Sequence, residues 1–189
     1  MTGPNAYERK KDPQGVRRAL LNKAAHLAAE QGLAAVTVEA VARAAGVTKG
    51  GLFHHFPNKS ALIHAMFADL LAHFDAAIDA RMAQDPVAHG RFTRAYLEAV
   101  FTDQALGDDN PSAALSVSTI ADPELLGEWS TWLAQRLEQH AATDDNALCE
   151  VVRLAADGVW LISISPDPTS PINFARARAA MLALTMLGA

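Results

Sequence analysis

The sequence predicts an all-α protein, and three observations support this. The 189 residues are 50% hydrophobic but only 6% aromatic, and alanine dominates the apolar set, which favours packed helices over sheet. Apolar residues recur at helical spacing, with no competing alternation of strand type. Five prolines follow a residue that can accept bonds from free amides, as at helix starts: Asp12-Pro13, Asp85-Pro86, Asn110-Pro111, Asp122-Pro123 and Ser170-Pro171.

Further starts are expected at Thr37, Thr48 and Asn58, and another near Asp144 or Asp145, whereas Gly32, Gly46 and Gly107 indicate stops or turns. About nine helices result, over residues 13–31, 37–44, 48–54, 58–83, 87–105, 111–120, 123–142, 145–164 and 171–187. The polar residues 1–12 are expected to form a mobile N-terminal arm. We expect one domain over 13–57 and a larger helical domain over 58–189.

The charges divide the chain into a basic head and an acidic body. Residues 1–66 hold nine Lys/Arg and four Asp/Glu, a net charge of +5, whereas the other residues carry a net charge of −10. Every lysine lies in the head. This asymmetry indicates that the head meets a polyanion, although two independently solvated surfaces would look similar.

Several classes of protein are disfavoured by composition. The lone Cys149 excludes a disulfide or a four-cysteine zinc site within the chain, and the seven histidines form no pair or cluster of metal-ligand type. We therefore expect no metal and no cofactor. The apolar end, residues 179–189, is shorter than the roughly 20 residues that span a membrane, and no signal peptide is visible. A cytoplasmic protein without membrane contact is expected.

Residues 37–56 carry the motif with the clearest functional meaning. Thr37 can cap a first short helix, Gly46 can end it with a positive φ, and Thr48 can cap a second. Two short helices joined by a tight glycine turn predict a helix-turn-helix, whose second helix enters the major groove of DNA. An ordinary corner between packed helices is the structural alternative.

The second helix has poor intrinsic propensity, since Gly50 and Gly51 each cost about 1 kcal/mol relative to alanine. Glycine permits close approach to another backbone. With the Thr48 hydroxyl, the Lys49 ammonium group and free amides, this end of the helix suits phosphates and base edges.

The segment from Arg17 to Phe67 resembles the DNA-binding domain of the TetR family of transcriptional repressors. The resemblance implies three N-terminal DNA-binding helices, a linking fourth helix and a helical body that binds ligand and dimerises. The matching residues are Leu20, Ala24, Ala25, Gly32, Thr37-Val38, Val41-Ala42, Ala45-Gly46-Val47, Gly51-Leu52-Phe53, His55-Phe56, Lys59 and Leu62.

The resemblance also implies which residues meet DNA. Phe53 departs from the family, which most often has tyrosine there, and phenylalanine has no hydroxyl group to donate. His54 occupies a variable position and could reach a base edge or a phosphate. The implied DNA contacts are Thr37, Thr48, Lys49, Gly50, Phe53, His54, His55 and Lys59.

The body contains most of the larger aromatic residues, which either fill the core or line an apolar pocket for a small-molecule effector. The resemblance implies such a pocket among the middle helices. The candidate lining residues are Phe67, Tyr96, Phe101, Ile120, Trp132 and Trp160.

The last two helices are candidates for a dimer interface. Residues 179–187 are apolar on every side, so several neighbours must cover them, and the same helix pair of a second copy is the simplest cover. A central helix within one chain is the alternative. The candidate interface residues are Val152, Ala155, Val159, Phe174, Met181 and Leu184.

These observations predict a repressor that binds a palindromic double-stranded DNA operator as a homodimer and is released by a small molecule in its C-terminal domain. An enzyme is disfavoured because the sequence has no Gly-x-Ser-x-Gly, no phosphate loop and no paired carboxylates in apolar surroundings. The remaining alternative is a helical interaction module that does not read DNA sequence.

Overall fold

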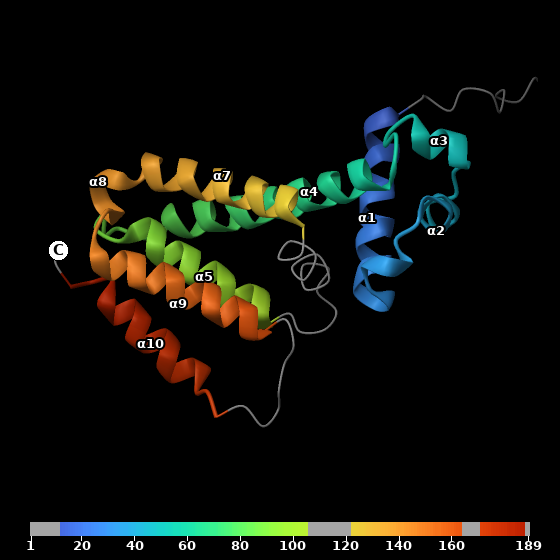
Figure 1. Ribbon diagram of the computed structural model, residues 1–189. Coiled ribbons are helices and arrows are strands. Elements are labelled where there is room, and N and C mark those ends of the chain that lie inside the picture. The colour runs from blue at the N-terminus through green and yellow to red at the C-terminus, as the bar shows by residue number, and fades with distance from the viewer. Residues whose placement is uncertain (1–11, 106–121, 164–170, 188–189) are drawn as a thin grey trace, which may run out of the picture. The chain divides into compact units, whose positions relative to one another are not determined.

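The computed structural model describes residues 12–105, 122–163 and 171–187, and within these ranges it is helical with no strand (Figure 1). The predicted all-α class is confirmed. The helices are α1 Pro13–Gln31, the 3-10 helix η1 Leu33–Ala35, α2 Val38–Ala44, α3 Lys49–Phe53, α4 Lys59–Met82, α5 Arg91–Ala105, α7 Pro123–Gln139, α8 Ala141–Asp144, α9 Ala147–Ser163 and α10 Phe174–Leu184.

The chain forms two compact units, Met1–Met66 and Phe67–Ala189. Their boundary lies inside α4, whereas the sequence suggested a boundary at residue 58, before that helix. Of the expected N-terminal arm the structure describes only Asp12, and the expected helix 111–120 and Gly107 lie outside the described residues.

Most of the predicted caps form as expected. The Asp12 carboxylate accepts a 2.8 Å hydrogen bond from the Gly15 amide, and the Asp122 carboxylate accepts one of 2.9 Å from the Glu124 amide. Asn58 likewise accepts from an amide of the first turn of α4, at 2.7 Å. These side chains begin α1, α7 and α4 for the reason that the sequence suggested.

Two proline pairs do not begin helices. Asp85 caps only a turn, because its other oxygen binds the Arg94 guanidinium at 2.7 Å, and α5 starts later, at Arg91. Gly90 turns the chain into α5 with φ 66°. At the other end, α10 starts at Phe174 rather than at residue 171, because Asn173 provides its cap.

The predicted boundaries also differ around α8. The expected helix 123–142 ends at Gln139, and α9 starts after Asn146, which accepts from the Cys149 amide at 3.0 Å. Asp144 is unavailable as that cap because its buried carboxylate accepts from the Thr93 amide in the first turn of α5, at 2.8 Å. The short η1 and α8 were not predicted.

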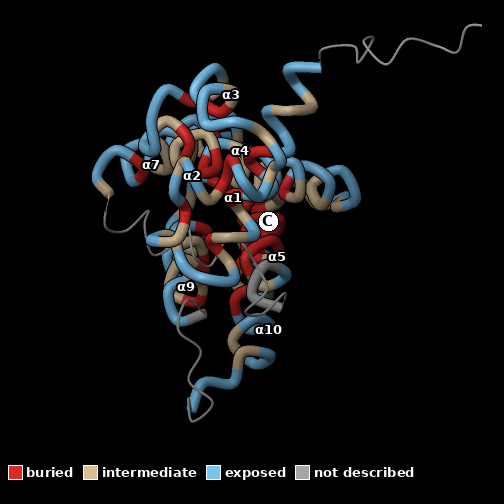
Figure 2. Tube along the Cα trace, turned by 90° about the vertical axis from the view of Figure 1, so that its right-hand side faces the viewer, coloured by how far each residue is buried: buried red, intermediate tan, exposed pale blue. Residues whose placement is uncertain are grey.

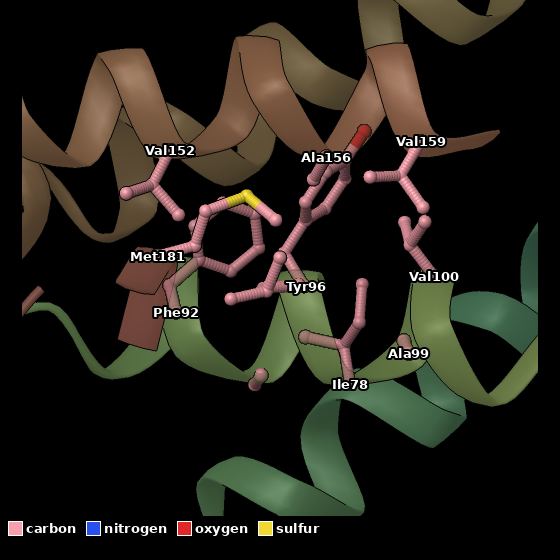
Figure 3. Packing of buried hydrophobic residues seen from close by; sticks show 11 residues of the cluster. Ile78, Phe92, Tyr96, Ala99, Val100, Val152, Ala156, Val159 and Met181 are labelled. Carbon is pink, nitrogen blue, oxygen red and sulfur yellow. The ribbon is translucent and has the colours of Figure 1, made fainter. Parts of the chain in front are cut away.

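Unit 2 has a core made mainly by α5 and α9, with α10 against both and α4 contributing Ile78. In Figure 3, Phe92 and Tyr96 of α5 lie against Val152, Ala156 and Val159 of α9, and Met181 of α10 lies beside them. In Figure 2 most residues of α5 are buried, whereas α10 is largely exposed. Burial of these side chains stabilises the unit by roughly 1.5–3 kcal/mol for each large residue.

Two buried arginines tie the ends of these helices together. Arg94 binds Asp85, donates to the carbonyl oxygens of Val87 and His89 at 2.7 Å each, and reaches the Thr185 carbonyl oxygen after α10 at 3.5 Å. Arg136 of α7 binds Asp79 of α4 at 2.5 Å. The positive charge of each guanidinium group is therefore compensated by a carboxylate within unit 2.

By length and composition alone, α4 is long and apolar enough to cross a membrane. Part of its apolar surface is packed within the two units, where Leu62, Met66, Phe67 and Ile78 are buried. Its C-terminal half also carries Asp79, whose carboxylate binds Arg136. A single helix of this kind is weak evidence for a membrane span.

Candidate nucleic-acid interface

The turn between α2 and α3 is fixed by local interactions. Gly46 adopts φ 67°, and the Val47 amide donates to the Ala42 carbonyl oxygen at 3.0 Å. On the inner side Val41 and Leu52 are fully buried, which anchors both helices on the core of unit 1. The predicted helix-turn-helix is therefore present, and α3 is held by one face only.

The threonine caps begin both helices of the motif. The Thr37 hydroxyl accepts from the Ala40 amide at 3.1 Å, and the Thr48 hydroxyl accepts from the Gly51 amide at 3.0 Å. Each hydroxyl group uses its oxygen as the acceptor, so its proton can still be donated to another oxygen. Capping and donation to a phosphate are compatible at both positions.

The eight residues predicted to contact DNA lie on α3, at the caps of α2 and α3, just after α3 and, for Lys59, at the start of α4. Seven are exposed and His55 is half-buried. Phe53 exposes 40% of its surface, which is unusual for a side chain of its size. The exposed residues are Thr37, Thr48, Lys49, Gly50, Phe53, His54 and Lys59.

Two of the cations near this surface have partners inside unit 1. Lys59 donates to the Leu33 carbonyl oxygen at 3.5 Å, a long bond that a phosphate oxygen can replace. The Arg17 guanidinium lies 4.4 Å from the centre of the Phe56 ring and covers that otherwise buried side chain.

Glu39 also belongs to this surface, although the sequence did not predict it. Its carboxylate in the first turn of α2 accepts a hydrogen bond from the ammonium group of Lys49, which also lies 5.8 Å from the centre of the Phe53 ring. The bond to Lys49 holds the pKa of Glu39 below its usual value. Spacing could not reveal the contact because the two residues are ten apart and on different helices.

Five aromatic residues of unit 2 form one cluster, namely Phe74, Phe92, Tyr96, Trp129 and Trp132. Tyr96 lies 5.6 Å from Phe74 and 6.5 Å from Trp132, ring centre to ring centre, and Trp129 lies 4.9 Å from Trp132. Of the six residues predicted to line a pocket, only Tyr96 and Trp132 belong to this cluster. Phe101 and Trp160 are half-buried against the same core, Phe67 is buried in α4, and Ile120 lies outside the described residues.

Two polar groups of this cluster are paired with acids. The Tyr96 hydroxyl donates to the Asp157 carboxylate of α9, and the Trp132 indole N–H donates to Asp75 at 3.0 Å. Burial raises the pKa of Asp157, and burial together with that carboxylate raises the pKa of Tyr96 well above its ordinary value. Tyr96 therefore stays protonated and keeps donating.

The residues predicted for a dimer interface lie mostly inside one chain. Val152, Val159 and Met181 are buried in the core of unit 2, where a second copy cannot cover them further. Phe174 and Leu184 are half-buried against that core, and Ala155 is exposed.

A second apolar face runs along α9 opposite the buried one. Its large side chains are exposed by 38–65% of their surface, and a Cβ built on Gly158 would meet no atom of its own chain within 4 Å. Residues at this spacing share one side of a helix. The exposed apolar residues are Val151, Leu154, Leu161 and Ile162.

A helix-turn-helix unit joined through one helix to a larger helical unit defines a class of DNA-binding regulators. Comparisons with known proteins identify the family within this class. Residues 90–186 match the family model "Tetracyclin repressor-like, C-terminal domain", and residues 20–66 match "Bacterial regulatory proteins, tetR family". The chain belongs to the TetR family and is a DNA-binding regulator.

Individual relatives agree with this assignment. Over 103 residues the chain is 35% identical to the HTH-type transcriptional repressor KstR2 of Rhodococcus jostii, a match that covers 54% of this chain and 48% of that protein. The match thus spans about half the length of this relative.

Solved structures of low sequence identity share the fold. The multidrug binding protein EbrR complexed with imidazole has a TM-score of 0.67 at 19% identity, over 97% of each chain. Its complex with malachite green has a TM-score of 0.68 at 20% identity, over 89% of this chain and 96% of that one.

Proposed function

We propose that the protein is a dimeric repressor that binds an inverted-repeat operator and releases it when a small molecule binds unit 2. The observation that carries the proposal is the exposed surface of α3, where Lys49, Gly50 and Phe53 project from a helix anchored by Leu52 alone. A helix held in this way can enter a major groove without disturbing its own core.

The charge of unit 1 supports contact with the DNA backbone. Lys59 donates to the Leu33 carbonyl oxygen, a partner that a phosphate can replace, and the Thr37 and Thr48 hydroxyls can donate to phosphate. Each phosphate contact releases counterions, so DNA affinity should fall steeply as salt rises from about 50 to 200 mM.

The exposed face of α9 supports a homodimer. Val151, Leu154 and Ile162 would be left in water in a single chain, and burying a large apolar side chain contributes roughly 1.5–3 kcal/mol. Gly158 lies between them, where the partner helix can approach closely. A two-fold dimer would present two α3 helices, one for each half of an inverted repeat.

The aromatic cluster supports an apolar effector. Phe74, Trp129 and Trp132 are only half-buried against the core, so their rings can take part in covering a ligand. The structural relative EbrR is described as a multidrug binding protein and has been solved with malachite green. We propose a flat, largely apolar small molecule as the effector.

Release of DNA would be a population shift. An effector that binds better to the conformation unfit for the operator moves the equilibrium toward that conformation. Helix α4 contributes residues to both units and would carry the change. Linkage requires that operator DNA weaken effector binding by the same factor. Such a regulator acts in the cytoplasm and without catalysis.

The proposal is tested by selecting fragments of genomic DNA with purified protein in the presence of nonspecific competitor. We expect enrichment of a few fragments that share an inverted repeat. The double variant Lys49→Ala/His55→Ala should lose these fragments but keep its fold, whereas Lys23→Ala, an exposed lysine on α1, should retain them. Absence of any enriched sequence with wild-type protein would instead favour an interaction module that does not read DNA.

A further inference from the structure

We infer that Glu39 is a specificity-determining residue that restrains Lys49 from binding DNA phosphates at sequences other than the operator. The inference rests on the proposed function, because it needs α3 to meet DNA. The negative charge of Glu39 opposes DNA binding in general and thereby raises the preference for the operator sequence over other sequences.

The position of Glu39 within the head is unusual. It is the only acidic residue between Glu30 and Asp69, a stretch that includes the whole helix-turn-helix. The side chain of Glu39 is 62% exposed, and that of Lys49 is 57% exposed. A carboxylate on a surface that approaches phosphates is repelled by them. The first turn of α2 favours an acid through the helix dipole, and the contact with Lys49 gives this carboxylate a second role.

The contact of Glu39 with Lys49 joins the two helices of the motif. Glu39 lies in the first turn of α2, and Lys49 is the first residue of α3. The ammonium group has the carboxylate as one neighbour and the ring of Phe53, with its centre 5.8 Å away, as another. Lys49 is therefore held by neighbours within unit 1 before any DNA is bound.

An exposed ion pair of this kind is weak, so a stronger arrangement of partners can replace it. At an arbitrary sequence a phosphate offers Lys49 one new partner and leaves the Glu39 carboxylate unpaired beside a polyanion. This exchange gains little, so Lys49 stays with Glu39 and contributes no phosphate contact.

At a suitable sequence both ions can find partners on the base edges. Lysine binds the O6 and N7 acceptors of guanine in the major groove, and glutamate accepts from the N4 amino group of cytosine. The ion pair is then exchanged for two base contacts instead of one phosphate contact. The partner of the Glu39–Lys49 pair is accordingly a G·C-containing step in the major groove.

The experiment measures binding to a short duplex of mixed sequence, which requires no knowledge of the operator. Wild type, Glu39→Gln, Lys49→Gln and the double variant are compared by fluorescence anisotropy at several salt concentrations. Glu30→Gln is the matched control, because it removes one exposed negative charge from α1 of the same unit. Circular dichroism verifies that each variant keeps its helices.

We expect Glu39→Gln to bind the mixed duplex about two- to fivefold more tightly than Glu30→Gln does. Its salt dependence should steepen by about one phosphate contact, a change of roughly 0.9 in the slope. In the Lys49→Gln background, Glu39→Gln should behave like the Glu30→Gln control, since Lys49 carries the effect.

The other outcomes contradict the inference in distinguishable ways. Equal effects of Glu39→Gln and Glu30→Gln would show that only net charge matters. A Glu39→Gln effect that persists without Lys49 would assign the role to direct repulsion of phosphate. If wild-type protein bound no DNA even at low salt, the proposed function itself would fail, and this inference with it.

Discussion

Gly50 and Gly51 are neighbours in α3, yet their surroundings differ. A Cβ on Gly51 would lie 3.3 Å from the Thr48 hydroxyl oxygen that caps the helix, whereas one on Gly50 would lie 4.0 Å from the same atom. Gly50 is exposed and Gly51 is half-buried. The two glycines therefore have separate roles, and alanine substitution can distinguish them.

We predict that Gly50→Ala stabilises the protein by about 0.5–1 kcal/mol, because alanine favours the helix and meets nothing closely. Gly51→Ala should gain less, since Thr48 must shift. Urea denaturation measures both. If Gly50 contacts the DNA backbone, Gly50→Ala should weaken operator binding in spite of the higher stability. Unchanged operator binding would remove Gly50 from the predicted contacts.

A second prediction at this scale concerns His140 and pH. Its ring stacks on Phe92, with centres 5.0 Å apart, and burial together with the Arg136 charge lowers its pKa. Acids also face it and act in the opposite direction, namely Asp75, Asp79 and Asp144. Because the folded state disfavours protonation, the stabilising contribution is complete above about pH 6.5, the ordinary value, and is lost as pH falls through the lowered value.

We therefore expect the stability of the wild-type protein to decrease below about pH 6.5, and His140→Phe to flatten that decrease. Thermal unfolding at a series of pH values measures the effect. His73→Gln is the control, because His73 is exposed and lies 3.7 Å from Asp69, so its loss should not flatten the curve. An identical slope in wild type and His140→Phe would rule out His140 as the cause.

Residue types alone indicated the caps and the turn of the helix-turn-helix, because caps and glycine turns act locally, whereas most of the predicted DNA contacts followed from the family resemblance. Thr37, Thr48 and Gly46 perform the predicted backbone roles. The sequence did not predict the contact of Glu39 with Lys49, because that contact depends on the crossing of two helices. Pairings set by tertiary packing leave no periodic signal in the sequence.

At the scale of elements, helix starts were predicted well wherever the capping side chain had no other partner. Asp12 and Asp122 cap their helices. Asp85 instead binds the Arg94 guanidinium, and Asp144 binds the Thr93 amide 51 residues earlier. The start of α5 was therefore misplaced by several residues. A carboxylate that is removed from water binds the group that best compensates its charge. Tertiary packing decides which group this is, and the sequence does not show it.

Arg94 allows a prediction for the elements that meet at the start of α5. Arg94→Met removes the partner of Asp85 and of four backbone or hydroxyl acceptors, so we expect a loss of about 3 kcal/mol. Arg178→Met breaks an exposed pair with Glu98 and should cost less than about 1 kcal/mol. Chemical denaturation compares the two, and equal losses would contradict a special role for Arg94.

At the scale of the whole molecule, two α9 residues predicted for a dimer interface, Val152 and Val159, are buried within their own chain. An apolar helix must be covered on several sides. In α9 the chain itself covers one apolar side and leaves the other in solvent. Val152 and Val159 face their own chain, whereas Val151 and Leu154 face solvent. Composition could not separate the two faces, because both are apolar.

The exposed face leads to a prediction about association. Gly158→Ala should stabilise the single chain by about 1 kcal/mol, as should the control Gly127→Ala in α7, because neither Cβ meets an atom within 4 Å. Only Gly158→Ala should weaken the dimer, since its methyl group would separate the two α9 helices. Sedimentation equilibrium measures the dimer constant, and equal constants for both variants would exclude this face.

The buried bond between Asp144 and the Thr93 amide also bears on synthesis of the chain. The two residues are 51 apart, so the ribosome finishes the first turn of α5 well before it adds the carboxylate that caps it. At about 5–20 residues per second the interval is roughly 3–10 s. The α5 start acquires its native cap only after α7 and α8 have been translated. The first turn of α5 is therefore completed by a residue that is synthesised later.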